Sequence, residues 1–142
     1  EPADQAFKLQ LYNIHESFGV GVFVIALLRL WNRRRRPAPP LPADLPGSMR
    51  VAAHATHVCL YVLLVLMPIT GFLATNAWGF PLKVFGVLPL PSPVGKDEAL
   101  AKVLSLLHWI GAMAIITFIA AHVAGALYHQ FVRRDGILRR ML

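Results

Sequence analysis

Residues 106–131 read LLHWIGAMAIITFIAAHVAGALYHQF, and this stretch decides the fold of the chain. It is apolar, and it is longer than the roughly 20 helical residues that cross a bilayer. Two histidines, His108 and His122, interrupt it fourteen positions apart. In a helix they lie about 40° apart around the axis and about 21 Å apart along it, so the two imidazoles share one face at two depths.

Two further apolar runs have the same character, and the composition of the chain agrees with them. Of the 142 residues, 56% are hydrophobic and 15% are charged, whereas soluble domains carry about a quarter charged residues. The sequence therefore predicts an all-α fold, a single transmembrane helical bundle over residues 1–142. The three spans are expected at residues 12–31, 51–77 and 101–132. The two loops between them, which contain Pro and Gly, are expected at residues 33–49 and 78–100. Pro68 is expected to bend the second helix without ending it.

The basic residues indicate the orientation of these spans. The four lysines (Lys8, Lys83, Lys96 and Lys102) lie toward one face, and the ten arginines lie toward the other, beside the first loop or in the C-terminal tail. The arginines are Arg29, Arg33, Arg34, Arg35, Arg36, Arg50, Arg133, Arg134, Arg139 and Arg140. The positive-inside rule places the arginine face, and with it the C-terminus, in the cytoplasm. Because topology explains the basic excess, nucleic acid is not an expected partner.

The histidines supply the chemistry. An imidazole inside a membrane needs a partner and usually has a task. The spacing of His108 and His122 suits two stacked haems, one in each leaflet, with this helix giving one axial imidazole to each. His15 is the only candidate at the depth of His108, so these two are the expected ligands of an outer haem. His122 could face His54, His57 or a histidine outside this sequence.

Other residues near the expected haems fit the same interpretation. Gly19 and Gly111 would let the backbone approach a flat macrocycle. Arg29 and Arg50, which lie closer to the bundle than the other arginines, could pair with haem propionates. Cys59 is the single cysteine, which excludes an internal disulfide and a Cys-rich metal site.

Five segments that cover essentially the whole chain, in order, resemble the bacterial cytochrome b561 family. They are LYNIHESFGV, LLRLWNRRRRPAPPLP, RVAAHATHVCLYVLLVLMPITGF, LLHWIGAMAIITFIAAHVAGALYHQF and RRDGILRRML. This family is related to the b-type cytochrome subunits of nickel–iron hydrogenases. The resemblance implies a four-helix bundle of the bacterial inner membrane that holds two b-type haems. It also implies electron transfer between a quinone pool and a partner or small oxidant, and one bacterial relative oxidises superoxide and reduces ubiquinone.

The resemblance also implies roles for individual residues. His15 and His108 match the ligands of the periplasmic-side haem, and His122 matches a ligand of the cytoplasmic-side haem. The family partner of His122 lies near the start of a first helix that this sequence lacks, so the three spans correspond to helices 2–4. We therefore expect that partner outside this sequence, and we do not expect His54 or His57 to be ligands.

That expectation agrees with the topology. Three spans with a cytoplasmic C-terminus put residue 1 outside, and the sequence begins with Glu instead of Met. A segment N-terminal to Glu1 is therefore expected.

Two alternatives come from other functional classes. The chain could be a haem-bearing membrane anchor that docks a periplasmic dehydrogenase or hydrogenase through the loop at 78–100. It could also be a transition-metal transporter, which is disfavoured because the histidines lie in different leaflets without an intramembrane carboxylate. Taken singly, His57 and His129 are more simply hydrogen-bonding residues between helices. Besides quinone and membrane lipid, a redox partner protein or a second copy of the chain is the expected partner.

Overall fold

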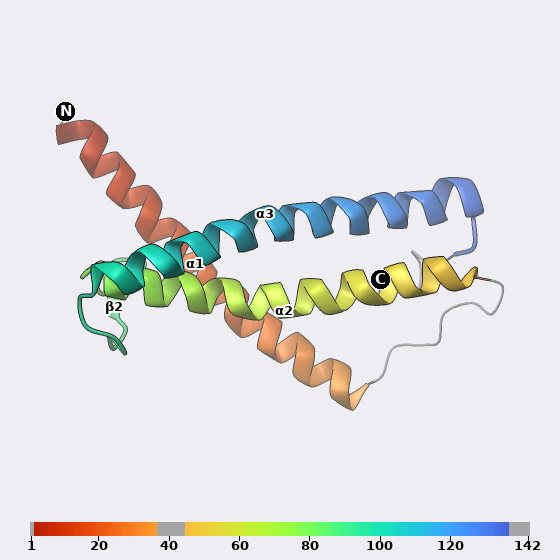
Figure 1. Cartoon of the computed structure of the whole chain (residues 1–142), viewed down its shortest axis with the longest axis horizontal. Coiled ribbons are helices and arrows are strands. Elements are labelled where there is room, and N and C mark those ends of the chain that lie inside the picture. The colour runs from red at the N-terminus through yellow and green to blue at the C-terminus, as the bar shows by residue number, and fades with distance from the viewer. Residues whose placement is uncertain (1, 37–44, 137–142) are drawn as a thin grey trace.

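Three long helices make up most of the part of the chain that the structure describes, and a small hairpin lies between the second and third (Figure 1). The computed structural model describes residues 2–36 and 45–136. In chain order the elements are α1 (Pro2–Arg35), α2 (Gly47–Ala77), β1 (Lys83–Val84), β2 (Leu88–Pro89), α3 (Glu98–Tyr128) and a short π-helix, η1 (His129–Arg133). Among these described residues, three helices are long and apolar enough to cross a membrane, so the predicted all-α transmembrane fold is confirmed.

We name the two ends of the molecule by their residues. The hairpin end contains residues 78–97, and the arginine end contains residues 33–36, 45–50 and 129–136. Within the first predicted loop, residues 37–44 lie outside the described residues, as do Arg139 and Arg140.

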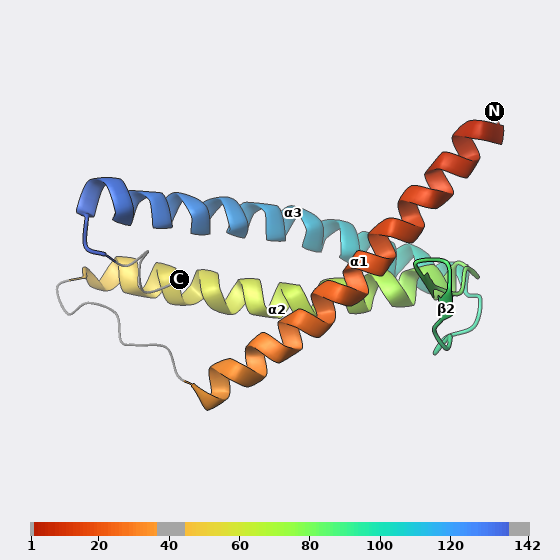
Figure 2. The same ribbon diagram turned by 180° about the vertical axis from the view of Figure 1, so that it is seen from behind.

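α2 and α3 lie side by side and antiparallel, and they form the most extensive helix contact of the molecule (Figures 1 and 2). Two glycines allow this approach. A Cβ atom on Gly71 would lie 2.9 Å from Cε1 of His108, and a Cβ atom on Gly111 would overlap Sδ of Met67. Small residues bring transmembrane helices together in this way. Gly111, which the sequence placed among the possible haem contacts, faces Met67 of α2.

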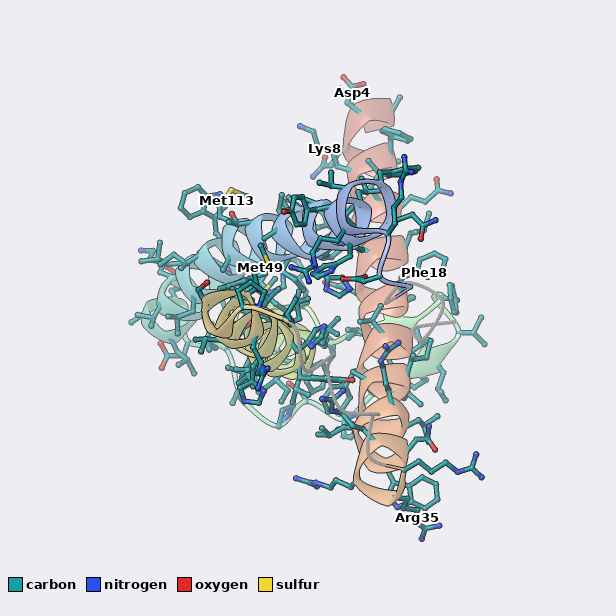
Figure 3. All side chains as sticks on the ribbon, turned by 90° about the vertical axis from the view of Figure 1, so that its right-hand side faces the viewer. Asp4, Lys8, Phe18, Arg35, Met49 and Met113 are labelled. Carbon is teal, nitrogen blue, oxygen red and sulfur yellow. The ribbon has the colours of Figure 1, made fainter. Side chains whose placement is uncertain are left out.

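α1 crosses α2 obliquely and diverges from the α2/α3 pair toward both of its ends (Figure 2). Its 34 residues are about 51 Å long, whereas the hydrocarbon core is about 30 Å thick. The additional turns beyond the predicted span at 12–31 carry charge: Asp4 and Lys8 lie near one end and Arg35 at the other (Figure 3). These charged turns extend the helix past the apolar span because they need not enter hydrocarbon.

The hairpin end has more structure than the predicted loop. β1 and β2 pair antiparallel, with Lys83 opposite Pro89 and Val84 opposite Leu88. Phe85 and Gly86 both have positive φ, 49° and 73°, which forms the tight turn between the strands. Beyond the hairpin, α3 begins at Glu98 instead of near residue 101. The Asp97 side chain caps this end of the helix, because its Oδ1 atom accepts from the backbone N–H groups of Ala99 and Leu100, each at 3.0 Å.

The few fully buried residues gather mainly at this same end. Ala77 and Ala101 are 0% exposed, and Ser17, Asn76 and Leu82 are 3% exposed or less. By contrast, apolar side chains along the helices are widely exposed. This distribution fits helices whose outer surfaces face lipid.

At the arginine end, α3 passes into η1, and the chain then reverses. Arg134 adopts a left-handed conformation with φ 52°, and Gly136 has φ 70°. α2 runs continuously through Pro68, as predicted.

Candidate functional site

His15 of α1 and His108 of α3 face each other near the hairpin end. Their ring centroids lie 6.1 Å apart, and the ring planes are nearly perpendicular at 86°. The two helices therefore bring together the two histidines that the sequence assigned to one depth.

A second contact fixes the orientation of His108. Its Nδ1 atom lies 3.1 Å from the carbonyl oxygen of Met67 and 3.2 Å from Oγ1 of Thr70. A carbonyl oxygen can only accept, so Nδ1 carries the proton and donates to Met67 across the helix interface. The other ring nitrogen, Nε2, is then left with its lone pair. Metal-binding histidines are commonly held in this way, with one ring nitrogen donating to a carbonyl and the other free to coordinate.

Gly71 makes this hydrogen bond geometrically available. A Cβ atom at position 71 would lie 2.9 Å from Cε1 and 3.2 Å from Nδ1 of His108. Such distances require the imidazole to move away from α2. Glycine at this position therefore lets the His108 ring lie against the backbone of the neighbouring helix.

The His15/His108 pair fits a metal ion held between two opposed imidazoles. With a metal–nitrogen bond of about 2 Å and a ring centroid about 1 Å behind the nitrogen, opposed rings have centroids about 6 Å apart. The observed 6.1 Å agrees with that separation. No group of three or more His, Cys, Asp or Glu side chains within residues 2–36 and 45–136 converges on a common metal position. A pair is sufficient for haem iron, because the porphyrin supplies the remaining four nitrogens.

The glycines of α1 leave room beside this pair. A Cβ atom added at Gly19 or Gly21 would meet nothing within 4 Å. Gly19, one turn beyond His15 and about 40° from it around the helix, therefore has space beside it for a flat group.

The second histidine pair lies toward the arginine end. His57 of α2 and His122 of α3 have ring centroids 5.2 Å apart, with an angle of 62° between planes. This separation is shorter than the roughly 6 Å of two imidazoles on opposite sides of one metal ion, and it fits an edge contact between rings. The structure thus places His57, and not His54, against His122. His54 is exposed on α2.

The arginines predicted near a haem have partners within the protein. Nε of Arg29 donates to the Tyr61 hydroxyl at 3.3 Å, and the Arg33 guanidinium lies 5.4 Å from the centre of the Tyr61 ring. Arg50 donates to the carbonyl of Leu45 at 3.3 Å. Arg29 and Arg33 are exposed, so their remaining donors can reach an anionic group between α1 and α2.

Two polar contacts were not expected from the sequence. Oγ1 of Thr75 donates to Oε1 of Glu16 at 2.8 Å, which links α2 to the residue beside His15. At the arginine end, Nδ1 of His129 donates to Oδ2 of Asp135 at 2.6 Å, and Arg133 reaches the same oxygen at 3.1 Å. The chain reversal after η1 brings Asp135 to these partners, and Gly136 is the residue in the sequence that indicates a turn there.

Comparison with known proteins gives a consistent result. The family model for prokaryotic cytochrome b561 matches residues 1–142. Cytochrome b561 homolog 2 of Escherichia coli (strain K12) is 35% identical over 130 residues, which are 91% of this chain and 69% of that protein. A protein of Yersinia pestis named probable superoxide oxidase CybB is 29% identical over 141 residues, covering 99% of this chain and 79% of that protein. Cytochrome b561 homolog 1 of Escherichia coli (strain K12) is 27% identical over 143 residues, which cover 99% and 80% of the two chains.

Proposed function

Because the chain belongs to the prokaryotic cytochrome b561 family, we propose that it carries electrons across the bacterial membrane between two bis-histidine haem sites and exchanges them with quinone. Family membership implies a b-type haem, and the three apolar helices agree with a multi-pass membrane protein. When bound, haem b supplies one-electron iron chemistry.

The observation that carries this proposal is the His15/His108 pair. At a ring separation of 6.1 Å, His15 and His108 would hold one haem between them, and the hydrogen bond from Nδ1 of His108 to Met67 leaves Nε2 with its lone pair. His15 and His108 come from different helices, so binding of one group by both would also tie α1 to α3.

The inner site is proposed to use His122 together with an imidazole from a helix that precedes this sequence. His57 approaches His122 too closely to act as its opposed ligand, and it supports the His122 ring by an edge contact instead. Arg29 and Arg33 lie on α1 near the same level and are the proposed partners of negatively charged propionates.

The orientation and the electron donor follow from the same reasoning. We place the arginine end in the cytoplasm, because the positive-inside rule favours it. The hairpin end then faces the periplasm, and a one-electron donor there would meet the His15/His108 site first. The relative from Yersinia pestis is named a probable superoxide oxidase, so superoxide is the small donor that we propose to test.

The test is optical spectroscopy of the purified protein with three reductants in turn: superoxide, a ubiquinol and dithionite. The proposal predicts the α-band of a low-spin b haem with dithionite, partial reduction with superoxide and reoxidation when ubiquinone is added. Absence of an α-band even with dithionite would overturn it. An α-band that ubiquinone does not oxidise would retain the cytochrome and reject quinone as its acceptor.

A further inference from the structure

The position of α1 is set mainly by α2 and by the hairpin. α1 packs on α2 and on β1, whereas its contact with α3 is slight. Yet α1 carries His15, whose ring must face His108 of α3. Rotation of α1 by a fraction of a turn would remove His15 from that position, so contacts with α2 and with the hairpin must fix the rotation. On the α2 side, Thr75 donates to Glu16, the residue beside His15, at 2.8 Å.

Two hydrogen bonds from the hairpin to α1 provide this restraint. Nδ2 of Asn13 donates to the carbonyl of Lys83 at 2.8 Å, and the backbone N–H of Phe85 donates to Oγ of Ser17 at 2.7 Å. The Ser17 hydroxyl donates to the carbonyl of Asn13 at 2.6 Å, which directs its lone pairs toward Phe85. Ser17 is 2% exposed, so water does not compete for this bond.

These two residues lie on the opposite side of α1 from His15. At about 100° per residue, Asn13 and Ser17 are about 40° apart, and His15 lies about 180° from the middle of the face that they share. The ring of Phe18, the next residue, packs edge to face on Phe85, with centroids 5.8 Å apart. Figure 3 shows Phe18 on the side of α1 where the hairpin lies. Through Asn13 and Ser17 the hairpin holds the side of α1 opposite His15, and Phe18, about 60° from His15 around the helix, adds a contact on the flank.

The residues that lead from α2 into the hairpin are hydrogen-bonded to the end of α2. The N–H of Gly79 donates to the carbonyl of Asn76 at 2.8 Å, and that of Phe80 donates to the carbonyl of Thr75 at 3.1 Å. Leu82 is 3% exposed and anchors the base of the hairpin. Because α2 also binds His108 through Met67, the hairpin and His108 share one rigid support.

We propose that the hairpin at residues 82–90 is a clamp that sets the rotation of α1, and that Asn13 and Ser17 are positioning residues for His15. This proposal rests on the proposed function, since it assumes that His15 and His108 bind one haem. It adds that the angle between the two imidazole planes, 86° in the structure, depends on side chains that do not touch the haem.

Electron paramagnetic resonance of the oxidised protein measures that angle. Ferric low-spin haems with perpendicular axial imidazoles give a strongly anisotropic spectrum with a large maximal g-value, and the value falls as the planes become parallel. The purified full chain is compared with Asn13→Leu, Ser17→Ala and Ser17→Thr. The matched control is Thr117→Ala, because Thr117 makes the same kind of bond within a helix, from its hydroxyl to the Met113 carbonyl at 2.9 Å, on the exposed surface of α3.

The clamp predicts that Asn13→Leu and Ser17→Ala keep the haem content but lower and broaden the maximal g-value of the His15/His108 site. Ser17→Thr, which retains the hydroxyl, and Thr117→Ala should match the unmodified protein. Unchanged spectra in both Asn13→Leu and Ser17→Ala would overturn the clamp, as would an equal change in Thr117→Ala. If Ser17→Ala does not accumulate, Asn13→Leu decides by the same criterion.

Failure of the clamp and failure of the proposed function give different results. If the unmodified protein contains no haem signal that depends on His15 and His108, the proposed function fails and the clamp fails with it. If that signal is present and insensitive to Asn13 and Ser17, only the clamp fails.

Discussion

Nδ1 of His108 donates a hydrogen bond to the carbonyl of Met67 across the interface between α3 and α2, at 3.1 Å. A helix carbonyl is a fixed acceptor, so this bond defines which ring nitrogen is protonated and where the other one points. The carbonyl is within reach because position 71, one turn further along α2, has no side chain.

Gly71→Ala tests this packing. The new Cβ atom would lie 2.9 Å from Cε1 of His108, so the ring must move and the bond to Met67 must lengthen. We expect a loss of about 1–3 kcal/mol in stability and a several-fold loss of haem from the outer site. Haem content per polypeptide and thermal loss of the α-band measure both effects. Gly125→Ala is the control, since its Cβ atom would meet nothing within 4 Å; equal behaviour of the two variants would contradict the packing argument.

Thr70→Val distinguishes the contributions of Thr70 and of the Met67 carbonyl to holding Nδ1 of His108. The substitution removes the hydroxyl 3.2 Å from Nδ1 but leaves the Met67 carbonyl in place. Since one good acceptor is sufficient for one N–H, we expect haem to be retained, at a cost of about 0.5–1.5 kcal/mol in stability. Haem content and the unfolding midpoint are the measurements. Complete loss of the outer haem would show that Thr70, and not Met67, holds the ring.

His122 and His57 should respond differently to substitution. Their centroid separation of 5.2 Å is too short for two imidazoles on opposite sides of one iron atom, so His122 is the predicted ligand and His57 its support. His122→Leu should remove the inner haem entirely, whereas His57→Phe should retain it with a shifted midpoint potential. Redox titration of each variant provides the measurement. Retention of two haems by His122→Leu, or loss of one by His57→Phe, would reverse these assignments.

The orientation can be tested by labelling from outside the cell. Ser92 and Ser48 are exposed at the hairpin end and the arginine end respectively, and replacing serine by cysteine barely changes the side-chain volume. In a Cys59→Ala background, we expect a membrane-impermeant maleimide to label Ser92→Cys in spheroplasts and to label Ser48→Cys only after lysis. The opposite pattern would place the arginine end in the periplasm.

The sequence contained enough information for the spans and for one histidine pair. His15 and His108 could be matched because depth is readable from the ends of apolar runs, and the contact at 6.1 Å agrees with that prediction. The partner of His122 could not be found in this way. His54 and His57 lie three positions apart on α2, so the sequence does not indicate which of them meets α3, and only the structure distinguishes His57 from His54.

The hairpin and its hydrogen bonds to α1 could not be predicted from the sequence, for a different reason. β1 and β2 have two residues each, which is too short to show strand periodicity. Asn13 and Ser17 are ordinary polar residues near a helix end, and their role depends on backbone groups of residues about 70 positions away. Gly86 was the one local signal for a turn.

The central claim is that His15 and His108 bind one haem between α1 and α3. The most direct measurement is the haem count per polypeptide, by pyridine haemochrome and by redox titration, for His15→Leu, His108→Leu and the double variant. Met113→Leu, an exposed change on the same helix as His108, is the control and should keep the full count. We predict that each single variant lacks the same haem and that the double variant loses no more than either one. Retention of the full count by either single variant, or loss of different haems by the two, would contradict the shared site.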